Sequence, residues 1–487
     1  MRDQAELQAA IAATRFALGA RPGELARIGA DARGWLEAQI RPDGAPQPQG
    51  QFVSSEEKTR QFSAYNALAG QAAQARERTA PSEGMAGAAD PQAQAADEAR
   101  RQGRRALQQD TAREFLARAQ LGATSDAGFA ERWALFWANL FTASATKFQS
   151  AVFLGPYERE AIRPHVFGRF EDLALAAETH PAMLLYLDQA QSVGPNSPLG
   201  QRREGAGLNE NLAREILELH TVGADGGYSQ ADVTEFARAL TGWSVPRPRD
   251  DRPLPRRAAA ALAGEPGPRG FVFRAVQHEP GTRAVMGRSY PAAGLDQGQA
   301  ILRDLARHPA TARRLSRRIA AHFVADEPPP ALADRLERAW TGSGGDLSAV
   351  ARALIAAPEA WAPQPLKVKT PYEFVISTHR ALGSTPARLQ TLAPTLAAMG
   401  QPLWAAPSPE GWPDTAADWA GPDALVKRLN YAKAVGDLSG ERVDAAAVAE
   451  AALGPRLTER TLQFVRRAES RPESLTLFLM SPEFQRR

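Results

Sequence analysis

The 487-residue chain contains no cysteine, and this absence removes several kinds of chemistry at once. Disulfide bonds, thiolate nucleophiles, cysteine-ligated zinc and iron–sulfur clusters all require cysteine. A metal site in this protein can therefore be built only from His, Asp, Glu and other oxygen donors. Long apolar runs are missing as well, because no stretch of about 18 uninterrupted apolar residues occurs, so no transmembrane helix is predicted.

Neither sign of charge is in excess, since 58 basic and 55 acidic residues give a formal net charge of +3. Phosphate binding usually shows as a basic stripe with a large charge excess, so nucleic acid is not a predicted partner. Only six of the basic residues are Lys, and two of these are Lys367 and Lys369. Where Arg predominates, a Lys marks a place that needs a compact ammonium group, although chance spacing is an equal explanation.

The first residues, Met1–Leu7, lack the basic start and apolar centre of a secretory signal. This pattern predicts a soluble, cytoplasmic protein. A periplasmic or envelope-associated location is the alternative, because a chain without cysteine is compatible with either compartment.

Apolar residues recur at helical spacing over most of the chain, which predicts an all-α fold. We expect one large multi-helix globular domain with a minor β-hairpin and two poorly ordered Pro/Gly/Ala-rich insertions. The expected divisions are an N-terminal helical segment that packs on the main body (1–42), a low-complexity, partly disordered insertion (43–105) and the main helical domain (106–487), which includes a Pro/Arg-rich loop (246–270) and a small hairpin (271–290). The chain has neither βαβ alternation nor a glycine-rich phosphate loop, which argues against doubly wound folds and P-loop enzymes.

One amphipathic segment, residues 209–220, concentrates the polar groups best suited to chemistry. Successive residues of an α-helix lie about 100° apart, which places Asn211, Glu215 and Glu218 within about 60° of one another. Arg214 lies alongside them. These four residues form the polar face of the segment, and its apolar residues fall on the opposite side.

Two interpretations of the polar face remain open. In the first it is a solvated surface on which Arg214 pairs with Glu218, four residues later. In the second, Asn211 and the two glutamates are oxygen ligands of a divalent metal, or the glutamates form a general acid/base pair. His220 falls near the apolar side and is predicted to be a buried, hydrogen-bonded core histidine rather than a ligand.

Two residues outside this segment are further candidates. Asp188 ends an apolar helix and could complete a metal site, although an Asp that ends a helix in a polar loop is the alternative. His278 stands beside Glu279 between the two expected strands. It could supply an acid/base group or a ligand, and a surface turn is the alternative.

A Pro-rich stretch near the C-terminus contains three of the nine tryptophans, Trp404, Trp412 and Trp419. Such a stretch either covers the helical core as a docked loop or offers stacking surfaces to a sugar or peptide.

Several short stretches, spread over nearly the whole chain, together form a recognisable set. They are Arg15–Gly23, Phe136–Trp137 with Asn139 and Phe141, His180–Met183, Asn209–Asn211 through Glu218–His220, Ala239–Trp243, Gly411–Pro413 and Ser481–Arg487. With this set the chain resembles the bacterial family catalogued as domain of unknown function 1800. The resemblance implies a mostly helical fold and no established activity.

The resemblance also implies a partner and draws attention to two departures. Genes of that family commonly neighbour those of another uncharacterised family, whose members look like exported sulfatase- or phosphatase-like proteins, and this implies a partnership. The chain has Leu140 where the family pattern usually has His, and Gln189 where Asn usually follows the Asp. If that His belongs to a metal or catalytic site, this protein is an altered or inactive member.

The function predicted on these grounds is an accessory or partner-binding role beside the product of a neighbouring gene. The alternative is a metal-dependent hydrolase, whose candidate site residues are Asn211, Arg214, Glu215, Glu218, Asp188 and His278. In that enzyme the glutamates would be ligands or acid/base groups, and Arg214 would hold an anionic group of the substrate. A concave position of the polar face would favour the enzyme.

Overall fold

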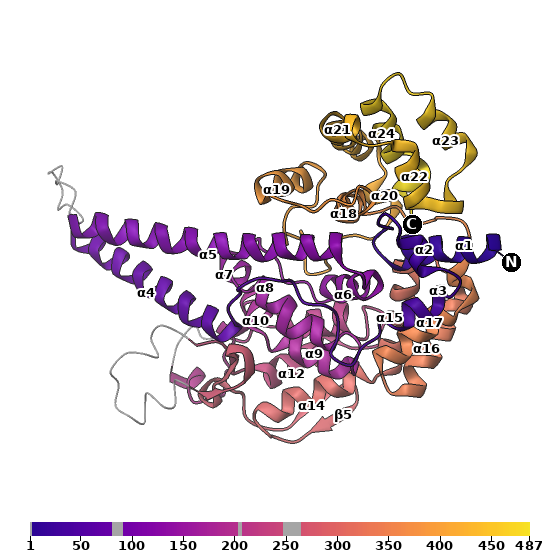
Figure 1. The fold of residues 1–487 in the computed structure, drawn as a ribbon. Coiled ribbons are helices and arrows are strands. Elements are labelled where there is room, and N and C mark those ends of the chain that lie inside the picture. The colour runs from indigo at the N-terminus through magenta and orange to yellow at the C-terminus, as the bar shows by residue number, and fades with distance from the viewer. Residues whose placement is uncertain (1, 80–90, 203–206, 247–263) are drawn as a thin grey trace.

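The computed structural model describes residues 2–79, 91–202, 207–246 and 264–487, most of which are helical (Figure 1). The predicted all-α class is confirmed. The helices up to residue 240 are α1 (Arg2–Ile11), α2 (Glu24–Ile28), α3 (Ala32–Glu37), α4 (Ser55–Thr79), α5 (Pro91–Thr124), α6 (Gly128–Leu140), α7 (Phe148–Ala151), α8 (Leu154–Tyr157), α9 (Phe170–Glu178), α10 (Pro181–Tyr186), α11 (Asn211–Glu215) and α12 (Gln230–Leu240). The later helices are α14 (Leu295–Ala306), α15 (Pro309–Phe323), α16 (Pro330–Ser343), α17 (Leu347–Ala356), α18 (Pro371–Ala381), α19 (Leu389–Ala398), α20 (Ala416–Trp419), α21 (Pro422–Ser439), α22 (Ala445–Leu453), α23 (Glu459–Arg466), α24 (Arg471–Met480) and α25 (Pro482–Gln485).

In the described residues the strands are short and form two small antiparallel sheets. They are β1 (Trp243–Ser244), β2 (Glu265–Pro266), β3 (Val272–Phe273), β4 (Arg283–Val285) and β5 (Arg288–Tyr290). The expected range of 271–290 does contain a hairpin, formed by β4 and β5, but a hairpin with one strand at 271–274 and the other at 284–287 was the expectation, and that pairing is wrong because β3 pairs with β1 and β2 instead. The reason is burial: Phe273 lies opposite Trp243 in the register, and both side chains are in the core. Residues 247–263 of the expected Pro/Arg-rich loop lie outside the described residues.

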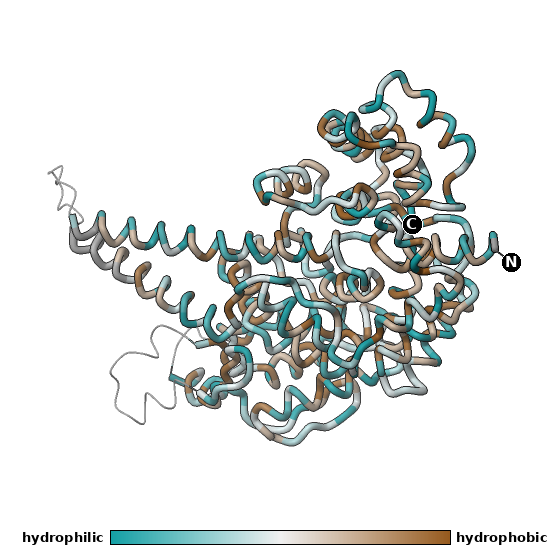
Figure 2. The backbone as a smooth tube through the Cα atoms, in the orientation of Figure 1, coloured by the Kyte–Doolittle hydropathy of each residue, from teal (hydrophilic) through white to brown (hydrophobic). Residues whose placement is uncertain are grey.

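Helices α4 and α5 pair with each other and project from the body as a long arm (Figure 1). They occupy much of the region expected to be a low-complexity insertion, of which residues 80–90 lie outside the described part. Hydrophilic residues predominate along the outer arm (Figure 2). The many Ala, Gln and Arg residues of this region favour helix formation by themselves, so the arm can be helical while burying little apolar surface.

The main hydrophobic core, called here the first core, is rich in aromatic rings. Trp133 and Trp137 of α6 are fully buried and pack against Phe129, Phe167 and Phe170. Complete burial of one such side chain contributes roughly 2–3 kcal/mol to folding. Among the described helices, none is long and apolar enough to cross a membrane.

A second core joins the C-terminal helices to the inner end of α5. It contains Phe115 of α5, Phe374 of α18, and Phe478 and Phe484 of the last helices. Trp404 packs against both cores. The boundary between the two cores therefore passes through the tryptophan-containing stretch.

Candidate functional site

The polar face predicted from residues 209–220 lies on a helix that changes type halfway. Asn211–Glu215 form α11, and Ile216–His220 continue it as a π-helical turn. Because a π-turn is wider than an α-helical turn, the regular rotation of about 100° per residue does not hold between Glu215 and Glu218. Asn211 is exposed, and the other three residues of the polar face are partly exposed.

The contacts of Arg214 differ from the expected pairing with Glu218. Its guanidinium lies 3.1 Å from Glu210 Oε2 and 3.0 Å from Gln230 Oε1. Glu218 instead acts on Tyr228, whose pKa is raised by burial and then by the charge of Glu218. The loop after α11 causes this difference, because it brings Gln230 and Tyr228 back against the helix.

Glu215 is the residue of the polar face most affected by its surroundings. Partial burial raises its pKa, and the charges of Glu218 and Glu178 raise it further against the opposing effect of His220. His220 is fully buried, as predicted, and its Nδ1 lies 2.7 Å from Oε1 of the equally buried Glu178. Glu178 was not a predicted candidate.

Asp188 and His278 have other immediate partners. Asp188 adopts the left-handed backbone conformation, with φ 57°, and its Oδ2 lies 2.6 Å from Nζ of Lys147. His278 Nδ1 lies 2.8 Å from the carbonyl oxygen of Thr241, and burial lowers the pKa of this histidine. In the described part of the chain, no three His, Asp or Glu side chains come together in a way that could hold a metal ion.

The two departures from the family pattern are both buried. Leu140 belongs to the first core, and Gln189 donates from Nε2 to the carbonyl of Leu240 at 2.7 Å. Leu140 adds an apolar side chain where a His would have added a possible ligand.

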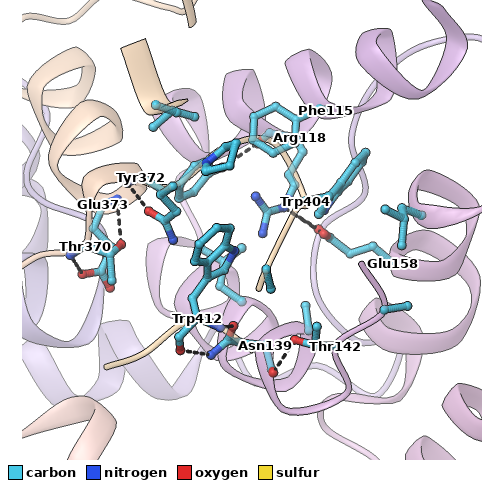
Figure 3. Close-up of a pocket in the computed structure, with 18 of the residues that line it drawn as sticks. Phe115, Arg118, Asn139, Thr142, Glu158, Thr370, Tyr372, Glu373, Trp404 and Trp412 are labelled. Atoms are coloured by element: carbon cyan, nitrogen blue, oxygen red, sulfur yellow. Dashed lines mark hydrogen bonds and ion pairs between the residues drawn. The ribbon is translucent and has the colours of Figure 1, made fainter. Parts of the chain in front are cut away.

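A cavity that the sequence did not reveal lies at the boundary of the two cores, with a volume of about 120 Å³ (Figure 3). We call it the Trp404 pocket. Its walls combine aromatic rings with amides and one ion pair. The lining residues labelled in Figure 3 are Phe115, Arg118, Asn139, Thr142, Glu158, Thr370, Tyr372, Glu373, Trp404 and Trp412.

The ion pair in this pocket joins Arg118 to Glu158, with 2.8 Å between Nε and Oε2. The Arg118 guanidinium also stands over the ring of Tyr372 at 4.7 Å and near that of Trp404 at 5.9 Å. The guanidinium is thus held between a carboxylate and aromatic faces. Trp404 itself has φ 45°, an uncommon conformation for a residue with a side chain, and such strain concentrates at ligand sites.

The tryptophan-containing stretch is fastened to α6 by Asn139. The side chain of Asn139 donates to the Trp412 carbonyl at 2.9 Å and accepts from the Trp412 amide at 2.8 Å. Gly411 precedes this contact with φ +91°, and a Cβ there would meet the Asn139 carbonyl oxygen at 2.5 Å. The stretch is therefore a loop docked on the helical body, and it also presents two tryptophans to the pocket.

His322 of α15 lines the same pocket and forms a pair with Asp414 of the docked loop. Its Nδ1 lies 2.7 Å from Asp414 Oδ2. Burial alone would raise the pKa of Asp414, but His322, Arg487 and Lys367 lower it, so the carboxylate is ionised and accepts from Nδ1–H. Burial lowers the pKa of His322, which keeps the ring neutral. Its Nε2 then has a free lone pair, and this buried atom has no hydrogen-bond partner among the described residues.

Buried charges surround this pair. Lys367 Nζ lies 2.6 Å from Asp326 Oδ1 and 3.4 Å from Asp414 Oδ1, so the rare lysine does occupy a place between two carboxylates. Arg487 Nε lies 3.1 Å from Glu373 Oε2, and Arg132 pairs with the other oxygen of Glu373. We call this set the buried charge network; its members are Arg132, His322, Lys367, Glu373, Asp414 and Arg487.

A second His pair in the molecule has the opposite proton arrangement. His180 Nε2 lies 2.7 Å from Ser55 Oγ, and both residues are fully buried. However, His180 Nδ1 accepts from the backbone N–H of Ala182, so the proton of the neutral ring is on Nε2 and is donated to Ser55. This histidine cannot take a proton from Ser55, and the pair caps the start of α10.

Sequence reasoning missed His322, Asp414 and Glu373. The available signals were the two lysines at 367 and 369 and the Gly411–Pro413 motif, which stands directly before Asp414. Nothing in the local pattern joins these segments to His322, because Asp414 is 92 residues away from it in the chain.

Comparison with known proteins identifies a family but no characterised relative. No curated protein and no solved structure matches the chain. A family model described as protein of unknown function (DUF1800) matches residues 11–486, nearly the whole chain. The chain therefore belongs to the DUF1800 family, as the resemblance predicted.

Proposed function

We propose that this protein is an enzyme that binds a small organic molecule in the Trp404 pocket and uses His322 as a general base. The single observation that supports the proposal most is the His322–Asp414 pair at the pocket wall. An ionised carboxylate fixes the tautomer of a neutral imidazole and leaves its second nitrogen free, which is the arrangement that proton abstraction requires.

The walls of the pocket indicate the class of ligand. Trp404, Tyr372 and Phe115 supply flat apolar faces, and Asn139 and Gln401 supply amide groups. Arg118 is the one cationic residue among the described residues that line this pocket, and its charge is already neutralised by Glu158. These features favour an uncharged molecule with a flat apolar face and polar edges, such as a sugar ring.

In the proposed reaction, a hydroxyl group or water molecule at the pocket gives a proton to His322 Nε2, an atom that neighbouring side chains cover in the free protein and that becomes reachable only when they move aside. The positive charge that develops on the imidazole is then stabilised by Asp414, which stays ionised. Burial lowers the pKa of His322, which favours the neutral form of the ring that can accept a proton.

The experiment is a screen of neutral glycosides and esters for binding, by thermal shift, and for turnover. For a substrate so found, His322→Gln should lower kcat by about 100-fold or more while the protein still binds the substrate. His379→Gln is the matched control, because His379 is a partly exposed histidine that contacts Ser384 and does not line the pocket. Equal turnover by the wild type and His322→Gln would refute the proposal.

An accessory, partner-binding role is a second candidate, and one surface supports it. Among the described residues, four of the six exposed large apolar side chains lie on α21, and the other two are Leu366 and Phe464. The four on α21 are Leu425, Val426, Leu429 and Leu438, of which Leu438 is 71% exposed. Exposed apolar groups on one helix are typical of a docking surface. Binding of the purified chain to the sulfatase- or phosphatase-like product of a neighbouring gene, lost in Leu429→Glu but kept in Lys433→Glu on the same helix, would support this role.

The metal-dependent hydrolase predicted from the polar face stays a prediction. The described residues do not bring three ligand side chains together there, so no step through a metal is derived. Metal analysis of the purified protein, repeated with Glu215→Gln, tests it directly: a bound metal that is lost in the variant would favour this alternative over the His322 mechanism.

A further inference from the structure

A second cavity lies beside the Trp404 pocket and shares Asn139, His322 and Asp414 with it. Its volume is about 260 Å³, and its lining is more highly charged. We call it the Arg314 cavity. Its other charged lining residues are Arg314, Arg318, Asp326, Lys367 and Glu410.

Two of these cations have no counter-ion at contact distance. Among the described residues, no carboxylate lies within 4.0 Å of the guanidinium of Arg314 or Arg318. Arg314 donates only to the carbonyl of Thr221, at the long distance of 3.4 Å. Lys367 differs from both, because it has two carboxylate partners.

The two arginines are also near each other. They stand four residues apart on α15, so they share one face of the helix, where like charges repel. Burial lowers the pKa of Arg314 to about 10, with a further lowering by the charge of Arg318. Burial also lowers the pKa of Arg318. Both guanidiniums are thus partly desolvated without a partner that compensates them.

The carboxylates that line the cavity do not remove this imbalance. Asp326 and Asp414 are engaged by Lys367, and Asp414 also by His322 and Arg487. Glu410 is exposed and contacts neither arginine. Its charge, like that of Asp414 on Arg318, acts on the arginine pKa values only through space. The cavity is therefore lined by two guanidinium groups that have no carboxylate at contact distance among the described residues.

We propose that the Arg314 cavity is an anion-binding site in which Arg314 and Arg318 together hold an oxyanion. A guanidinium presents a planar fork of N–H donors that matches carboxylate and phosphate oxygens, and two such forks at one cavity suit a small dianion or the acidic end of an organic molecule. The site is independent of the reaction proposed for the Trp404 pocket, since it needs neither the aromatic walls nor the free Nε2 of His322.

The test is a titration of the purified chain with inorganic phosphate and, separately, with succinate, by calorimetry in buffer of constant ionic strength set by NaCl. Saturable binding is expected for at least one of the two anions. Binding of inorganic phosphate would identify a site for a free anion. Binding of succinate but not of phosphate would identify a site for an organic acid. Absence of saturable binding of both to the wild type would overturn the proposal.

Variants locate the site. Arg318→Gln and Arg314→Gln should each weaken binding by about 10-fold or more, because each removes one charged fork. Arg317→Gln removes the same charge from an exposed position of the same helix and should leave the affinity unchanged. Circular dichroism checks that the variants fold, and Arg318→Lys, which keeps the charge but not the fork, should bind with intermediate affinity. An equal loss in Arg317→Gln would show that the binding is not at this cavity.

Discussion

The polar face and the buried charge network both place carboxylates near a histidine, but the two regions are assembled differently. The residues of the polar face are close in sequence, and water reaches all of them. The members of the buried charge network come from α6, α15, α18, two loops and the C-terminal residue, and Arg132, Lys367 and Arg487 are almost fully buried. Charges in the second region interact at a lower effective dielectric constant, so their mutual effects are larger.

Helical pitch predicts which residues of one helix share a face, but it does not predict contacts between distant segments. Pitch alone aligns polar groups on any solvated helix, so an aligned stripe is weak evidence of a site. His322 and Asp414, by contrast, are far apart in the sequence. They are in contact and largely shielded from water only because the rest of the fold holds them together.

The largest effect is expected from Glu373→Ala. This change leaves the buried guanidiniums of Arg132 and Arg487 without their shared carboxylate, and loss of one partner from a buried pair costs about 3–5 kcal/mol. Urea denaturation measures the loss in free energy of unfolding. A loss in free energy of unfolding smaller than that of an exposed ion pair would mean that the network is effectively solvated. The two regions would then not differ in the way described above.

Gly411→Ala should destabilise the protein by about 1–3 kcal/mol. The alanine would need a positive φ, and its Cβ would press on the Asn139 carbonyl oxygen. The docked loop should shift, so binding in the Trp404 pocket should weaken together with stability. Gly227→Ala is the control, since it also has positive φ but meets no atom within 4 Å; equal losses in both variants would show that the close approach to Asn139 is unimportant.

The two regions should respond to pH in opposite senses. The pKa of His322 is lowered in the folded state, so its stabilising contribution is complete above about 6.5 and is lost as the pH falls towards the folded pKa. The pKa of Glu215 is raised, so its contribution is complete below the unfolded value near 4.5 and is lost as the pH rises through the folded pKa. Unfolding free energies of the wild type, His322→Gln and Glu215→Gln between pH 4 and 8 measure both slopes, and slopes of the same sign would contradict the assignment.

The smallest effect is expected from Arg214→Ala, at most about 1 kcal/mol. The Arg214–Glu210 pair is substantially exposed, and exposed pairs contribute little to stability. A cost near that of Glu373→Ala, measured by the same denaturation, would show that the polar face is more tightly organised than its exposure indicates.

The sequence was sufficient for the helical class and for the burial of His220, because both follow from the period of the apolar residues. For the tryptophan-containing stretch it left two alternatives open, a docked loop and a stacking surface; the docking is observed, and the stacking role stays a prediction. The sequence could not place His322 beside Asp414. That contact depends on how α15 and the loop after Gly411 pack, and no local period encodes it. The predicted pairing of Arg214 with Glu218 was wrong because Arg214 turns instead to Glu210, four residues earlier, and to Gln230 at the start of α12.

The position of Trp404 against both hydrophobic cores has a consequence for cooperativity. A molecule bound in the pocket would touch side chains of each core, so partial unfolding of either one would release it. By mass action, bound ligand then stabilises each core by RT ln(1 + [L]/Kd), where [L] is the free ligand concentration and Kd its dissociation constant. Melting steps that are separate in the free protein would therefore merge into one transition as the pocket fills, and a calorimetric trace would report the existence of a ligand before its chemistry is known.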